Sequence, residues 1–226
     1  MKNYKTFLAP KDEVWQQAVD RYNLFREAEM QEYFSMKDYS YHFRDNRAYD
    51  LSLAPKISPA IIADFEIRTG VNVPDGLTDM LCTHGGFKIG EGILDIFGGR
   101  DQAVFPNLEQ TFAKYGYAGF TTKIGSGMLK SLNGFYFFFG ISFPESEEMS
   151  FLYFTKAGNF GKMLFAPQNE NLVLKKVLPA MFNGSSEKFT LDGLISNQID
   201  RVIINALTVK GYIDSVSYTH LTLPTS

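Results

Sequence analysis

The chain has 226 residues, of which 45% are hydrophobic and 15% aromatic. This composition is sufficient for a packed core and argues against a chain that is disordered as a whole. The formal net charge of −3 and the pI near 5.7 disfavour a nucleic-acid-binding protein, because such proteins usually present a basic surface. A single cysteine, Cys82, excludes an internal disulfide and a cysteine-based zinc site, so we expect a reducing, cytoplasmic compartment. No signal sequence follows Met1, and no run approaches the roughly 20 apolar residues that span a bilayer.

The N-terminal part of the chain predicts a helical extension. Apolar residues recur at steps of three and four within residues 12–34, which is the period of an amphipathic helix. Residues 33–53 are aromatic and charged, and we interpret them as an irregular connector that can hold one short strand. We therefore treat residues 1–56 as a helical extension of the main domain.

Residues 57–98 predict two helices followed by strands. Ser58 is a good N-cap with Pro59 at the first helical position, and Gly70 supplies the left-handed stop. A second helix should begin after Pro74 and end at the double glycine, from which the chain leaves as a strand. The apolar residues expected to face inward on these two helices are Ile61, Ile62, Phe65, Leu77, Met80 and Leu81.

The central part predicts one capped helix, a loop and several strands. Asn107 can cap a helix that Gly116 closes, residues 119–127 are expected to form a loop, and residues 128–132 a single helical turn. Three apolar, aromatic runs predict buried strands at residues 135–140, 151–154 and 161–165, with a hairpin turn at residues 156–159. Residues 172–181 fit a strand or a helix, and the sequence leaves both open.

The last predicted element is a helix capped by Thr190. Its apolar residues have amphipathic spacing, and Asp200 and Arg201 are expected on the solvent side. The residues from Val216 to Thr225 resemble the translated transposase adapter used in sequencing-library preparation. We therefore exclude residues 215–226 from the fold as a tail that is not native, and place the main domain at residues 57–214.

These elements predict an α+β fold: a mixed, largely antiparallel sheet with helices packed on one face, plus the N-terminal extension. A series of short motifs within residues 57–98 resembles the signature of the SUKH superfamily, also described as the cell-wall assembly regulator family. The motifs are Phe65-Glu66, Thr69-Gly70, Val73-Pro74, Leu77, Leu81, His84-Gly85-Gly86 and Asp95-Ile96-Phe97-Gly98. Family members often carry Asn where this chain has His84.

The resemblance implies a SUKH-like fold and a binding function rather than catalysis. Bacterial members of that family are mostly immunity proteins that bind and neutralise partner toxins, often nucleases. We accordingly expect an immunity protein that occludes a cognate toxin. Two alternatives stay open: a regulatory or scaffold protein of the same fold that binds endogenous partners, and an enzyme of unknown type.

The residues offer little support for catalysis, metal binding or a cofactor. His42 and His84 form no HExxH pair, and Cys82 and His84, two residues apart, would point away from each other on a helix. Gly125-Ser126-Gly127 is followed by Lys130 where a dinucleotide fingerprint requires a third glycine. The aromatic run at residues 135–139 lacks the basic neighbours of a base-stacking platform, so a core strand is the better interpretation.

The most concentrated charge in the sequence is acidic. Glu145, Glu147 and Glu148 lie close together at the expected tip of a hairpin, and Asp101 is a fourth candidate. A solvated hairpin tip explains the pattern without any function. As a contact surface, however, these carboxylates suit a basic protein partner such as a nuclease. We predict a protein toxin as partner, with no direct nucleic-acid or membrane contact, and leave the oligomeric state open.

Overall fold

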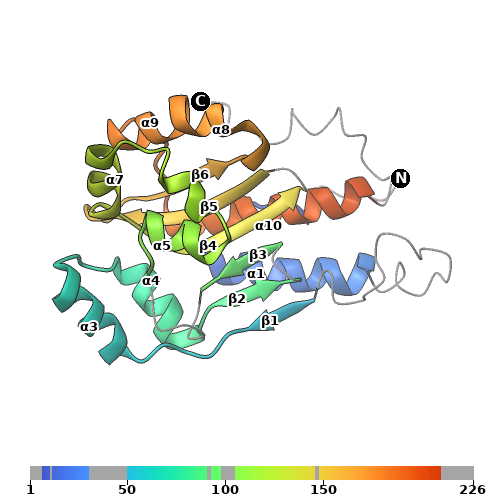
Figure 1. Cartoon of the computed structure of the whole chain (residues 1–226). Coiled ribbons are helices and arrows are strands. Elements are labelled where there is room, and N and C mark those ends of the chain that lie inside the picture. Colours follow the sequence, from blue (N-terminus) through green and yellow to red (C-terminus); the bar gives the residue numbers. More distant parts are fainter. Residues whose placement is uncertain are drawn as a thin grey trace.

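A computed structural model describes residues 7–10, 12–30, 50–90, 93–97, 105–145 and 148–209. Runs of helices separate groups of strands along the chain, and this α+β organisation is visible in Figure 1. The elements are α1 (Trp15–Phe25), η2 (Arg26–Met30), β1 (Leu51–Leu53), α3 (Pro59–Thr69), α4 (Asp75–Asp79), η4 (Met80–His84), β2 (Phe87–Ile89), β3 (Leu94–Ile96), α5 (Leu108–Lys114), α6 (Ala118–Thr121), α7 (Ser126–Asn133), β4 (Tyr136–Glu145), β5 (Glu148–Thr155), β6 (Phe160–Phe165), η5 (Pro167–Asn169), α8 (Glu170–Leu172), η6 (Val173–Val177), α9 (Leu178–Phe182) and α10 (Leu191–Val209).

The strands form one six-stranded sheet within the described residues, in the sequential order β1-β2-β3-β4-β5-β6. Every pair of neighbours is antiparallel, so the prediction of a mixed sheet was wrong in that detail. The expected turn at residues 156–159 joins β5 to β6, with Gly158 at a positive φ of 80°. The β2–β3, β4–β5 and β5–β6 connections are short, as antiparallel neighbours allow, whereas α3, α4 and η4 lie between β1 and β2 and α5 to α7 lie between β3 and β4.

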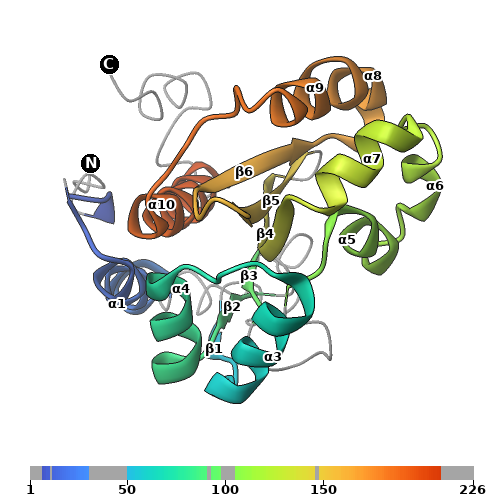
Figure 2. The same ribbon diagram turned by 90° about the vertical axis from the view of Figure 1, so that its left-hand side faces the viewer.

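Helices cover both faces of this sheet, which corrects the prediction that they pack on one. Along β4, Phe137 and Phe139 belong to a core shared with α1, α3 and α10, whereas Tyr136 and Phe138 belong to a second core under α5, α6, α7 and α9. Because successive side chains of a strand point to opposite faces, a run of consecutive aromatics predicts burial on both sides. Figure 2 shows α1 and α10 on one side of the sheet and α5 to α9 on the other.

The segment with the family-like motifs folds largely as its sequence indicates. The Ser58 side chain accepts a hydrogen bond from the Ala60 N–H, and Gly70 ends α3 in the left-handed conformation. Gly85 ends η4, and a Cβ there would lie 2.2 Å from the Ala54 carbonyl oxygen, so only glycine fits this turn. Ile61 is an exception, because its side chain is exposed while the neighbouring Ile62 is buried.

Two predictions for the layer above β4 to β6 need correction. Residues 119–127 are no simple loop, since α6 covers part of them, and α7 is longer than the single turn expected. The reason is tertiary: Phe120 is buried against the rings of Phe112 and Phe165, which outweighs the low helix propensity of glycine. The ambiguous residues 172–181 are helical, in η6 and α9.

The last helix confirms the predicted cap and apolar face. The Thr190 hydroxyl oxygen accepts a hydrogen bond from the Gly193 N–H, and the apolar set from Leu191 to Leu207 is buried. Strand β1 and helix α1 lie within the predicted extension, yet they join the same sheet and core as the rest. The division at residue 56 stays a prediction, and the tail at residues 215–226 lies outside the described residues.

Candidate functional site

The β4–β5 hairpin is the longest pair of strands and carries the acidic residues predicted as a contact site. A β-bulge between Phe138 and Gly140 places Phe139 and Gly140 opposite one residue, Leu152. A Cβ on Gly140 would lie 2.9 Å from the Ile96 Cδ1 atom and 3.1 Å from the Leu152 Cδ1 atom. A larger residue at position 140 would therefore require the Ile96 and Leu152 side chains to shift, and the bulge sets which face each later residue of β4 occupies.

The far end of this hairpin extends beyond both neighbouring strands. Among the described residues, β3 pairs with β4 as far as Ser142, followed by a hydrogen bond from the Phe143 N–H to the Ile93 carbonyl oxygen, and β6 pairs with β5 as far as Met149. The next pair along the hairpin is Glu145 opposite Glu148, beyond a second irregularity that includes Pro144. Proline lacks an N–H, so it suits a position that has no further strand to pair with. Within the described part of the chain, no strand flanks the hairpin end at Glu145 and Glu148.

The structure brings two of the four predicted contact residues together. Glu145 and Glu148 occupy directly opposite positions in the register, although their side chains are outside the described part. Glu147 and Asp101 lie outside the described residues altogether. The predicted hairpin is therefore confirmed in its backbone, whereas its role in binding stays a prediction.

A buried ion network that the sequence analysis missed lies between α1, α10 and the segment before α1. The Arg21 Nε and Nη2 atoms donate to the two Glu13 carboxylate oxygens at 2.7 and 2.8 Å. Arg21 Nη1 lies 2.8 Å from Asp200 Oδ1, which also accepts a hydrogen bond from the Ala9 N–H. Asp200, expected on the solvent side, is therefore a partner of Arg21, and the neighbouring Arg201 lies against Ser150, with Nη1 3.4 Å from Oγ.

The two carboxylates of this network have opposite pKa shifts. Burial raises the pKa of Glu13, but hydrogen bonds from Arg21 and Ser196, together with the Arg21 charge, outweigh it and hold the pKa below the ordinary value. Burial also raises the pKa of Asp200, and there the Arg21 charge and the Ala9 N–H only partly offset it. Charge repulsion between the two carboxylates adds to the shift of Asp200.

A pocket of about 490 Å³ adjoins this network and is lined by Asp12, Glu13, Asp192 and Ser196 among others. Two of its three carboxylates have partners: Glu13 binds Arg21, and Asp192 accepts a hydrogen bond from the Trp15 N–H at 2.9 Å. These contacts hold the beginning of α1 on the beginning of α10. The network therefore has a structural role: it holds α1 against α10. No local pattern in the sequence links its charges.

Cys82 and His84, weighed earlier as a nucleophile and its base, have other surroundings. Burial and the nearby charge of Asp79 raise the pKa of the Cys82 thiol, which disfavours the nucleophilic thiolate. The His84 ring packs edge-on against Trp15 with ring centroids 5.0 Å apart. Both residues thus have structural contacts at the end of η4.

Over the described ranges, the side chains of His, Cys, Asp and Glu form no group of three or more that could hold a metal ion. In the same part of the chain, no helix has the length and apolar character needed to cross a membrane.

The chain matches none of the family models, curated proteins or solved structures with which it was compared. Its assignment to the SUKH superfamily therefore stays a prediction that rests on the motifs within residues 57–98.

Proposed function

We propose that this protein is an immunity protein that binds a cognate bacterial toxin and occludes it, with the end of the β4–β5 hairpin as a contact. The observation that carries the proposal is the pair of glutamates opposite each other at Glu145 and Glu148, beyond both flanking strands. The motif resemblance supplies the class of partner.

Placing like charges opposite each other in a sheet costs folding free energy. Like charges at directly opposite positions of an antiparallel pair are destabilising, whereas opposite charges contribute roughly 0.2–1 kcal/mol. The register therefore places two glutamates where folding gains nothing from their pairing. A basic partner surface would turn the repulsion into attraction on binding.

A nuclease toxin fits this chemistry best. An enzyme that binds nucleic acid has a positive cleft, and an acidic inhibitor gains association rate from long-range attraction to it. The attraction weakens as added salt shortens the screening length, from about 10 Å at 0.1 M to about 3 Å at 1 M.

The proposal is tested by reversing the charge at the hairpin end. In surface plasmon resonance with the toxin encoded beside this gene, the double variant Glu145→Lys with Glu148→Lys should associate more slowly than the parent. The difference should shrink between about 0.05 M and about 0.5 M salt. Because the double reversal leaves like charges opposite each other, it should fold as well as the parent.

A matched control carries the same change in net charge on another surface. Asp20 and Glu27, both exposed on α1 and η2, serve for the double variant Asp20→Lys with Glu27→Lys. The control should associate nearly as fast as the parent and should protect cells that produce the toxin. Equal slowing by both variants would show that only net charge matters, and unchanged rates at low salt would remove the hairpin end from the interface.

A further inference from the structure

The opposite end of the same hairpin gathers exposed aromatic and basic side chains. Among the described residues, the exposed large hydrophobic side chains include two aromatic ones, Phe135 and Phe182, 38% and 49% exposed. Phe135 precedes β4 and Phe182 ends α9. The Tyr136 hydroxyl donates a hydrogen bond to the Met181 carbonyl oxygen, so one contact holds both phenylalanines in the same region.

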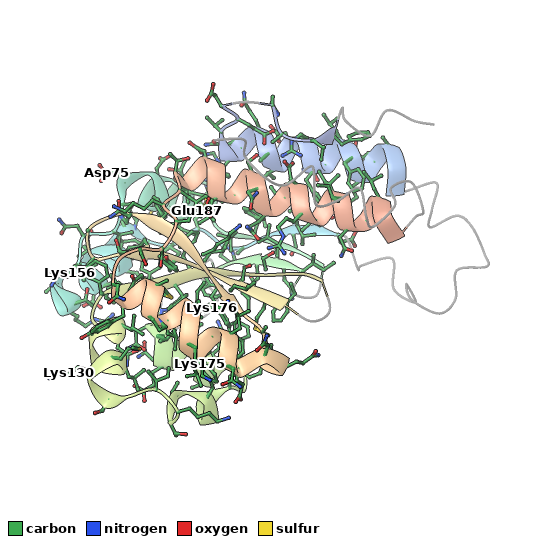
Figure 3. The ribbon with its side chains drawn as sticks, turned by 90° about the horizontal axis from the view of Figure 1, so that it is seen from above. Asp75, Lys130, Lys156, Lys175, Lys176 and Glu187 are labelled. Carbon is green, nitrogen blue, oxygen red and sulfur yellow. The ribbon has the colours of Figure 1, made fainter. Side chains whose placement is uncertain are left out.

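Two exposed lysines lie in the same region. The Lys156 N–H donates to the Phe135 carbonyl oxygen at 2.8 Å, and the Lys130 carbonyl oxygen accepts from the Gly134 N–H at 3.1 Å. Figure 3 shows Lys130 and Lys156 at one end of the molecule. Neither ammonium group has a partner within the described residues. We call the surface formed by Lys130, Phe135, Lys156 and Phe182 the lysine–phenylalanine patch.

The chain segments that build this patch contain no acidic residue. Residues 130–136, 153–159 and 178–186 meet here, and their only charged side chains are those of Lys130 and Lys156. Their remaining exposed polar side chains include uncharged groups such as those of Ser131, Asn183 and Ser185. Lys130 and Lys156 are thus the charged groups of these three segments, while the Glu109 carboxylate borders them at the pocket, where it accepts a hydrogen bond from the Asn133 side-chain amide at 3.1 Å.

A pocket of about 330 Å³ opens beside the patch, at Asn133 and Gly134. Three phenylalanine rings form its apolar part, with Phe65 edge-on to Phe105 and to Phe137 at centroid distances of 5.1 and 5.5 Å. The carboxamide oxygens of Asn107 and Gln110 each accept a backbone N–H of the other residue. Their amide nitrogens have no acceptor in the described part of the chain, so these two lining residues can supply hydrogen-bond donors beside the phenylalanine rings.

We propose that the lysine–phenylalanine patch and the adjoining pocket bind single-stranded nucleic acid. Surfaces of this kind combine lysines for the phosphates with aromatic rings on which bases stack. The amide donors of the pocket suit the acceptor atoms on the edge of an unpaired base. Lysine and serine are depleted at the centre of protein–protein interfaces, which makes a protein partner a poorer fit. The inference is independent of toxin binding at the other end of the hairpin.

The composition of the whole chain led to the opposite expectation. Net charge is a property of all surfaces together, whereas phosphate contacts depend on charge within about one screening length of roughly 8–10 Å. With few lysines available, binding should be weak and strongly dependent on salt. For two phosphate contacts, the affinity should fall about fivefold to tenfold between about 50 and about 200 mM salt.

Fluorescence anisotropy with labelled oligo(U) and oligo(dT) of about 12 nucleotides tests this inference. The double variant Phe135→Ala with Phe182→Ala should weaken binding about tenfold or more, because stacking is lost. Lys130→Glu and Lys156→Glu should each weaken binding and flatten its salt dependence. The controls are Leu24→Ala with Ile67→Ala, exposed at 62% and 83% on other helices, and Lys56→Glu, which carries the same charge change.

All substituted side chains are exposed, so the variants should keep the parental circular dichroism spectrum and melting temperature. Stronger retention of oligo(U) than of oligo(dT) would identify RNA as the ligand, and the reverse would identify DNA. Absent binding at the lowest salt, or equal weakening by the control variants, would overturn the proposal. A protein partner that needs Phe135 and Phe182 while oligonucleotides fail to compete would overturn it as well.

Discussion

The two helical layers on either side of the sheet differ in which cationic residues they carry and in whether those residues have partners. On the side of α1, α3 and α10 the helical cations are arginines, each held by a partner: Arg21 by Glu13 and Asp200, Arg26 by Asp50, Arg68 by Asp64, and Arg201 by Ser150. On the side of α5 to α9 the cations are lysines: Lys123 in the turn after α6, and Lys114, Lys130, Lys175 and Lys176 on the helices. The last three have no partner among the described residues.

This difference separates charge that holds the fold from charge that is available for contact. Arginine presents a planar group that binds two carboxylates at once and stays charged when buried, as Arg21 does. Lysine is a flexible, strongly hydrated point charge, so it suits an exposed surface. The packing of the lysine side relies instead on rings, with Phe112 in contact with Phe120, Phe151 and Phe165. Substitutions on the two sides should therefore act through different mechanisms.

The largest effect is expected at Arg21. Arg21→Met keeps most of the side-chain volume but leaves the buried Glu13 and Asp200 carboxylates without their cation, which should cost about 3–5 kcal/mol of unfolding free energy. Denaturant unfolding followed by circular dichroism measures the loss. Lys123→Met is the control on the lysine side, because its half-exposed pair with Glu170 should contribute less than about 1 kcal/mol. Similar losses in the two variants would contradict the distinction between the layers.

A smaller loss is expected at the centre of the lysine side. Phe112→Leu keeps an apolar residue but removes ring contacts with Phe120, Phe151 and Phe165, and should cost about 1–3 kcal/mol. The cost should not depend on pH or salt, since no charge takes part. A marked salt dependence of the loss would show that this core is coupled to the charged groups around it.

Local signals in the sequence were sufficient for the capped helix ends and the buried strands, but not for α6 or for residues 172–181. Ser58, Gly70, Asn107 and Thr190 each cap or end a helix as predicted, because a cap depends on a hydrogen bond within a few residues. The buried strands were predicted from runs of aromatic residues. The same runs contained the evidence for burial on both faces, since consecutive aromatics leave neither face of a strand polar.

Contacts between distant residues could not be predicted in the same way. Arg21 and Asp200 are 179 residues apart, so no periodicity links them, and Asp200 was placed on the solvent side by its position on the helix. The lysine–phenylalanine patch could not be predicted either, because a hydrogen bond between β4 and α9 brings Phe135 and Phe182 into the same region. The hairpin end was predictable because its glutamates are neighbours in sequence, whereas its freedom from flanking strands required the register.

The stability that the carboxylates around Arg21 contribute should depend on pH. The pKa of Glu13 is lower in the folded protein than its ordinary value of 4.5, so its contribution is present above about pH 4.5 and is lost as the pH falls through the folded pKa. The effect of Asp200 on stability has the opposite sign. Because its pKa is raised in the folded protein, its contribution to stability weakens as the pH rises and the carboxyl ionises. Glu13→Gln removes the first effect, together with the part of the Asp200 pKa shift that comes from repulsion by Glu13. The stability difference between parent and variant should therefore shrink on acidification from about pH 6 to about pH 3. A constant difference would show that Glu13 acts through packing rather than charge.

The smallest effect is expected at the end of the β4–β5 hairpin, beyond both flanking strands. Glu145→Lys alone replaces a repulsive pair by an attractive one and should raise the unfolding free energy by about 0.2–1 kcal/mol. Adding Glu148→Lys restores like charges and should return the stability to the parental value. A double-mutant cycle measured by thermal unfolding in low salt isolates this coupling, and Asp20→Lys with Glu27→Lys shows the effect of net charge alone. Stabilisation by the single variant, together with slower association of the double variant with the toxin, would show that the glutamate pair costs stability and serves binding. If the single variant is no more stable than the parent, the two glutamates do not repel each other, and the argument for a partner at this end loses its physical basis.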